Sequence, residues 1–186
     1  MSEALFQLHF KAQSSLARLR LLNVLRVRLR RRNPRHLDII LELESEMQIL
    51  NEIAASGAGA LALIVERRGS APRGVGAMLL LRPDGSCCGT VGGGSLEQQV
   101  VASLGQLQQD GHGVIRSFQL LPEQDGMPCG GRLTLLLVRL SSDVVPVFAA
   151  AVAGLEAGRG CNLLVGLTDN GQACWSVDQP AGDALH

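Results

Sequence analysis

The sequence contains no tyrosine, and its aromatic content is only 3%. A surface that stacks unpaired bases needs exposed aromatic rings, so this scarcity disfavours specific binding of single-stranded nucleic acid. No apolar run approaches the roughly 20 residues that a membrane-spanning helix requires. With 46% hydrophobic residues, the chain has enough apolar material for a packed core, and we expect a soluble protein.

The cysteines and histidines lack the spacing of a structural metal site. No C-x-x-C pair occurs, and the four histidines are scattered along the chain, so we expect no metal. The cysteine count is odd and no secretory signal is visible, which favours reduced thiols in the cytoplasm. The five cysteines are Cys87, Cys88, Cys129, Cys161 and Cys174.

The net charge of zero conceals an uneven distribution. Residues 1–36 carry nine of the 17 basic residues and one acidic residue, and the other 150 residues carry eight basic and 16 acidic groups. Such an arm could bind nucleic acid or anionic lipid. The alternative, which we favour, is a disordered extension or an artefact of a start codon placed too far upstream, with Met47 as another start.

Local patterns predict an α/β fold with a mixed sheet, flanking helices and glycine-rich loops at strand ends. Three segments have helical spacing or capping signals: 39–55 after Asp38, 95–109 with a capping box of Ser95 and Gln98, and 145–155. Seven segments have the composition of strands: 61–66, 77–81, 86–91, 114–120, 133–138, 162–167 and 172–177. In the third of these, Cys87 and Cys88 should face opposite sides, as structural residues.

Three loops could carry chemistry, and the first is Gly92-Gly93-Gly94 at a predicted helix start. Glycine lets the backbone approach a ligand closely, and the N–H groups of a helix N-terminus suit an anion such as phosphate. A tight strand-to-helix turn is the alternative. The loop is neither a Walker motif nor a G-x-G-x-x-G fingerprint.

The second loop, 126–131, places Cys129 beside Gly130 and Gly131, where backbone N–H groups could stabilise a thiolate or an anion. Cysteine in a turn could equally pack as a small apolar residue. In the third loop, 69–73, Arg73 could offer a planar fork to a phosphate, or it could simply be solvated. The three loops follow successive strands, so we expect a glycine-lined anion pocket with one thiol and one arginine.

Three stretches together resemble the N-terminal domain of the XdhC/CoxI family of xanthine dehydrogenase accessory proteins: ALALIVERRGSAPRGVGAMLLLRPDGS, GTVGGGSLE and DGMPCGG. The resemblance covers about residues 47–140. It places the family's motif positions on Gly69, Ser70, Pro72, Arg73, Gly92, Gly93, Gly94, Leu96, Glu97, Cys129, Gly130 and Gly131.

The resemblance implies a chaperone that binds molybdenum cofactor, as molybdopterin or its dinucleotide form, and assists its insertion into a molybdenum hydroxylase such as xanthine dehydrogenase. A sulfur donor, a separate protein carrying the C-terminal domain and a second copy of the chain are further implied partners. Together with the charge distribution, the resemblance divides the chain into three parts. These are the basic arm 1–36, a cofactor-handling domain 37–142 and a spacer-like helix and hairpin 143–186. The C-terminal dinucleotide-type domain of many members is expected to be absent.

Two other functions compete with the chaperone hypothesis. Cys129 could be the nucleophile of a sulfur-transfer or thiol redox enzyme, which would react with electrophiles as a thiolate. The basic arm could instead make the chain a nucleic-acid or membrane-surface module, whose binding would weaken with salt. We expect the chaperone hypothesis, with a non-catalytic protein, to hold.

Overall fold

The computed structural model describes residues 4–10, 38–39, 43–120, 130–157, 161–168 and 171–178. It contains the helices α1 (Leu43–Ser56), α2 (Gly94–Asp110) and α4 (Val145–Glu156), the last preceded by a short 3-10 turn, Ser142–Val144. Its strands are β1 (Ala4–Phe10), β2 (Asp38–Ile39), β3 (Gly59–Arg68), β4 (Met78–Leu81), β5 (Cys87–Gly89), β6 (Val114–Gln119), β7 (Arg132–Leu140), β8 (Cys161–Leu167) and β9 (Ala173–Asp178).

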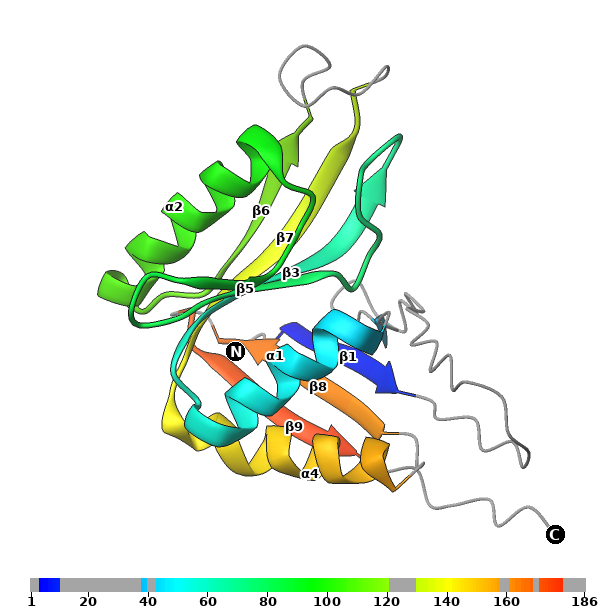
Figure 1. Ribbon diagram of the computed structural model, residues 1–186, viewed down its shortest axis with the longest axis vertical. Helices are drawn as coiled ribbons and strands as arrows, with labels where there is room; N and C mark the ends of the chain where they lie inside the picture. Colours follow the sequence, from blue (N-terminus) through cyan, green and yellow to red (C-terminus); the bar gives the residue numbers. More distant parts are fainter. Residues whose placement is uncertain are drawn as a thin grey trace, which may run out of the picture.

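The strands form two sheets (Figure 1). The larger has the order β5-β4-β3-β7-β6, and all its neighbours are antiparallel. The smaller has the order β2-β1-β8-β9 and is mixed, because β1 and β2 run parallel. The long strands β3 and β7 form the centre of the larger sheet, although about 60 residues separate them in the sequence.

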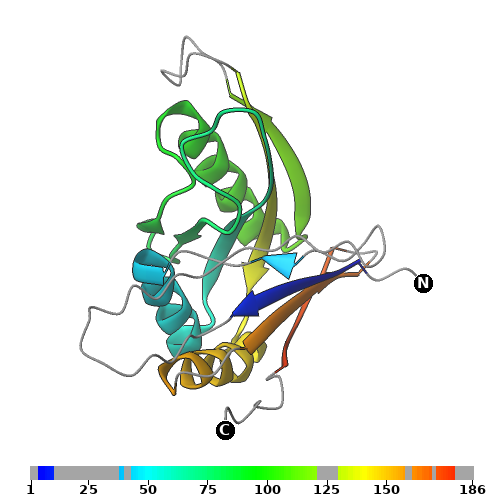
Figure 2. The same cartoon turned by 90° about the vertical axis from the view of Figure 1, so that its right-hand side faces the viewer.

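The five-stranded sheet is buried on both faces, which gives two cores. One core lies between the sheet and α2. The other lies between the opposite face, α1, α4 and β8. The residues of β3 alternate between them, as the two-residue period of a strand requires: Leu61, Leu63 and Val65 face α1 and α4, and Ala60, Ala62 and Ile64 face α2. The turned view shows α2 beside the upper part of the sheet and α4 with the smaller sheet below (Figure 2).

The mixed α/β class is confirmed, and all three helices and seven strands predicted from the sequence are present, with ends shifted by at most four residues. The largest shift is in α1, which begins at Leu43. Asp38, expected to cap that helix, lies in β2 instead, where it pairs with Gln7 of β1. That prediction was wrong because the pairing partner lies 31 residues away and leaves no local signal.

Two features differ from the expected division of the chain. No element was predicted within residues 1–36, yet β1 pairs along its whole length with β8. The hydrophobic core also continues across the boundary expected at residue 142, because Phe148 of α4 and Val165 of β8 pack in one core with Ile53 of α1. In the described part of the chain, no helix is long and apolar enough to cross a membrane.

Candidate functional site

The loops 69–73 and 130–131 lie side by side at one end of the five-stranded sheet. The cause is the antiparallel pairing of β3 with β7, which places Arg68, the last residue of β3, opposite Arg132, the first residue of β7. Gly69 therefore leaves the sheet beside Gly131. This proximity follows from strand pairing alone and needs no direct contact between the motifs' side chains.

Gly131 packs closely against the backbone of the loop 69–73 and of the end of β3. A Cβ atom on Gly131 would lie 2.0 Å from the carbonyl oxygen of Ser70 and 3.1 Å from that of Arg68. Both neighbours are backbone atoms, so no side chain can turn aside to make room. Glycine at position 131 is therefore required by packing, whatever else the loop does.

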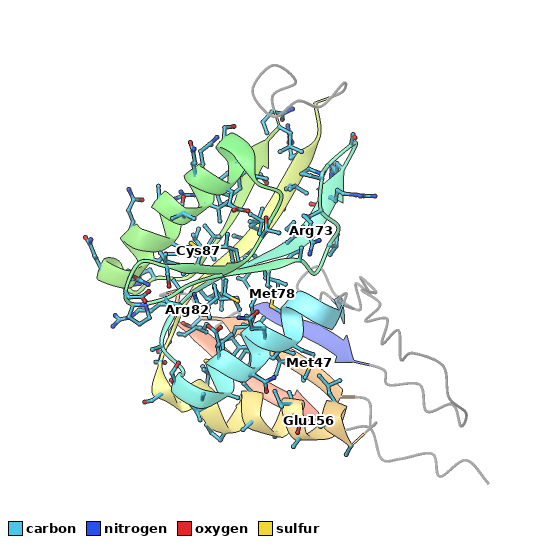
Figure 3. The ribbon with its side chains drawn as sticks, in the orientation of Figure 1. Met47, Arg73, Met78, Arg82, Cys87 and Glu156 are labelled. Carbon is cyan, nitrogen blue, oxygen red and sulfur yellow. The ribbon has the colours of Figure 1, made fainter. Side chains whose placement is uncertain are left out.

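The triple-glycine loop joins this group through Pro72. A Cβ atom on Gly92 would lie 2.5 Å from Cγ of Pro72, and Gly92 has a φ of 138°. Arg73 follows Pro72 and is half-buried in the β3–β4 loop, above α1 in Figure 3. The structure thus brings together Gly69, Ser70, Pro72, Gly92 and Gly131.

Gly93 differs from the other motif glycines because it faces open space. Its φ of 73° and ψ of −168° belong to a region that only glycine adopts without strain. A Cβ atom there would meet nothing within 4 Å. The loop therefore offers a ligand an unobstructed approach at Gly93, and Gly94 beside it is exposed.

The helix that follows begins without the capping box predicted for Ser95 and Gln98. α2 starts at Gly94, its N-cap is Gly93, and no side chain of the cap residue bonds the helix. The prediction was wrong because the cap position holds a glycine, and a carboxylate from the first turn takes the N-cap N–H instead. That carboxylate is Glu97, which accepts a hydrogen bond from the N–H of Gly93 at 3.1 Å.

Glu97 and Thr90 hold the glycine loop from inside. Oε2 of Glu97 also accepts hydrogen bonds from the hydroxyl of Thr90 and from the N–H of Val91, the latter at 3.2 Å. The N–H of Gly92 donates to Oγ1 of Thr90 at 3.1 Å. Three successive N–H groups, of residues 91–93, are thus directed into the protein and not toward an external anion.

Thr90 is the residue that the sequence analysis missed. The motif was recognised by its glycines, and a bond between side chains seven residues apart, across a loop and a helix start, has no periodic signature. The Thr two residues before the glycine run is the one sequence feature that could have indicated it, because Ser and Thr often bond backbone N–H groups two residues on.

Two further arginines lie at this end of the sheet. Arg68 forms an ion pair with Glu66 at 2.9 Å, and its side chain is 69% exposed. Arg132, directly opposite Arg68, has its guanidinium 3.4 Å from Oε1 of Gln119. With Arg73, three arginines therefore lie at this end of the sheet, and Arg68 is paired with a carboxylate.

The cysteines divide as the alternation of β5 predicts: Cys88 is buried and Cys87 is exposed. Partial burial, and then the carboxylate of Glu97, raise the pKa of the Cys87 thiol. Burial likewise raises the pKa of Cys88. Cys129 lies outside the described residues. Among the residues that are described, no group of three His, Cys, Asp or Glu side chains could hold a metal ion.

A surface hollow of about 600 Å³ lies elsewhere, at the start of β6. It is lined by His112, Gly113, Val114, Ile115, Leu167, Thr168 and Gly171. None of the predicted site residues lines it. The length of β6 separates it from Gly131 by roughly 20 Å, so we assign the candidate site to the joined loops.

Comparison with known proteins shows what part of the chain has relatives. Residues 53–119 match the XdhC and CoxI family. This segment is similar to that family, which confirms the resemblance that the motif stretches indicated. It includes loop 69–73 and the glycine loop with Glu97, whereas Gly130 and Gly131 lie beyond the matched residues.

Two relatives from Escherichia coli K12 each match a little under half of the chain. The molybdenum cofactor insertion chaperone PaoD is 42% identical over 96 residues, which is 49% of this chain and 30% of PaoD. The uncharacterised protein YqeB is 38% identical over 81 residues, 42% of this chain and 15% of YqeB. The chain thus spans less than a third of the length of either XdhC/CoxI relative.

A crystal structure shares the fold. A chain of a xanthine dehydrogenase from Bacillus halodurans superposes with a TM-score of 0.61 over 73% of this chain and 43% of its own length. The sequence identity is 22%. At this identity the likeness concerns the fold, and it covers most of the chain.

Proposed function

We infer that this chain binds the molybdenum cofactor at the joined loops and assists its insertion into a molybdenum hydroxylase. The observation that carries the inference is the contact between motif loops far apart in the sequence, at Gly131 with Ser70 and at Gly92 with Pro72. Loops that pack this closely form one surface. The resemblance of the chain to PaoD, a molybdenum cofactor insertion chaperone, supplies the choice of cargo.

The residues present fit the chemistry of this cargo. A pterin with a phosphate is anionic, and this end of the sheet presents Arg73, whose neighbour Pro72 packs against Gly92 at the start of α2. The open side of Gly93 allows close approach. In the proposal, the phosphate binds at Arg73 and the first turn of α2, and Cys129, Gly130 and Gly131 lie toward the metal.

The cargo's proposed recipient is a hydroxylase of the xanthine dehydrogenase type. The proposal includes two further partners, a sulfur donor and a separate protein that carries the family's C-terminal domain. It places the process in the cytoplasm. No observation favours the sulfur-transfer enzyme, so we do not propose it.

The experiment is purification from a host that makes the cofactor, followed by measurement of molybdenum and of oxidised-pterin fluorescence per mole of protein. We expect pterin with the wild type, strong loss in Arg73→Ala and retention in Arg139→Ala, an exposed arginine on β7 at the far end of the sheet. Cys129→Ala tests whether the thiol takes part. Equal loss in both arginine variants, or no pterin in the wild type, would contradict the proposal.

A further inference from the structure

Glu97 belongs to the motif by sequence, but its surroundings are not those of a residue that contacts cargo. It is half-buried, and a single oxygen, Oε2, accepts three hydrogen bonds from the preceding loop. An ionised carboxylate offers about four lone-pair sites in total. Most of its capacity is thus spent inside the protein.

Glu97 also has the wrong charge for direct binding of a phosphate. A carboxylate beside the N-terminus of α2 offsets the positive end of the helix dipole. A carboxylate that faced the cargo would therefore compete with the anionic phosphate for backbone N–H groups. What the carboxylate does supply is a fixed conformation for the glycine loop, whose residues are otherwise the most costly of all to order.

Thr90 completes this arrangement. Its hydroxyl donates to Glu97 and accepts from the N–H of Gly92, so it links the side chain to the centre of the loop. The two residues together satisfy the N–H groups of three consecutive positions. With those groups satisfied, Gly93 keeps the glycine-specific backbone conformation that leaves its other side open.

We propose that Thr90 and Glu97 are positioning residues: they hold the triple-glycine loop in the conformation that accepts the cargo, without touching the cargo. This inference rests on the proposed function. It assigns a role to Thr90, which the motif comparison does not include, and it changes the role of Glu97 from ligand to support.

The test compares conservative and disruptive variants in the full chain purified from the cofactor-producing host. Glutamine at position 97 can still accept from the two N–H groups and can donate to Thr90, so Glu97→Gln should keep pterin retention within about threefold of the wild type. Glu97→Ala leaves the donors without an acceptor and should lose roughly tenfold. Gln98→Ala, next to it and exposed on α2, is the matched control and should retain pterin.

Two more measurements separate support from direct contact. Amide hydrogen exchange of the segment 89–97 should become faster in Glu97→Ala and not in Glu97→Gln, with exchange in the middle of α2 unchanged. Thr90→Val should lower pterin retention when it is the sole change. It should have a smaller effect in the Glu97→Ala background, where only the bond from the N–H of Gly92 to Thr90 is left to lose.

The outcomes are distinct from those of the proposed function. Absence of pterin from the wild type refutes the function itself. Pterin in the wild type with equal losses in Glu97→Gln and Glu97→Ala would mean that the carboxylate contacts the cargo, and unchanged retention in Glu97→Ala would mean that it has no role. Either result overturns the positioning assignment.

Discussion

Replacing Gly131 by alanine tests the central geometric claim, that two motif loops are packed together backbone against backbone. The added Cβ would lie 2.0 Å from the carbonyl oxygen of Ser70, whereas ordinary contact begins at 3.4 Å. The difference, 3.4 − 2.0, requires the loops to separate by 1.4 Å. Overpacking of this kind typically costs 1–3 kcal/mol, and because rigid backbone is involved we expect about 3 kcal/mol.

Thermal and urea unfolding measure this cost. For a domain of this size, about 3 kcal/mol lowers Tm by roughly 6–12 °C. The amide of Leu120 should also exchange faster, because it donates to the carbonyl oxygen of Gly131 at 2.8 Å. Pterin retention should fall with the separation of the loops.

Gly74→Ala is the matched control, since it lies in the adjacent loop and its Cβ would meet nothing within 4 Å. It should leave stability within about 0.5 kcal/mol, or raise it slightly by restricting the unfolded chain. If Gly131→Ala melts within a degree or two of Gly74→Ala, the loops are not packed as described and the joined site is wrong.

Three further predictions concern other parts of the chain. Gly105→Ala, in open space within α2, should raise the free energy of unfolding by about 0.5–1 kcal/mol, and a lower Tm would show that a neighbour needs that space. Glu52→Gln removes the negative charge and one of the two oxygens that accept from Arg82, at 2.7 and 2.8 Å, and should cost about 1 kcal/mol at neutral pH. The hydrogen bond from Arg82 lowers the pKa of Glu52 from 4.5. The stability that the pair contributes is therefore present above pH 4.5 and is lost as the pH falls through the folded-state pKa. If the wild type and Glu52→Gln still differ in stability by the same amount at about pH 2, the pair has no such role. Cys87 should be alkylated at pH 7.5 more slowly than a model thiol, because its pKa is raised, while buried Cys88 stays unlabelled. Peptide mapping should show faster labelling of Cys87 in Glu97→Gln, and an unchanged rate would remove the electrostatic link between them.

The sequence by itself determined the motif content and the secondary structure from α1 to β9, but not β1 and β2. Helix α2 and the strands β3 and β7 follow from the spacing and composition of apolar residues, which reflect burial against whatever lies opposite. The opposite facing of Cys87 and Cys88 also follows from neighbours in the chain. The motif order indicated the XdhC/CoxI family before any contact was known.

Only the tertiary structure decided what the motif residues do. Gly92 and Gly131 are glycines because Pro72 and Ser70, residues distant in the sequence, occupy the space of a Cβ. Glu97 accepts bonds from its own loop because that loop folds back over the first turn of α2. Local sequence records which conformations a residue can adopt and which face it buries. It does not record which distant backbone arrives beside it, because that depends on strand pairing summed over the whole sheet.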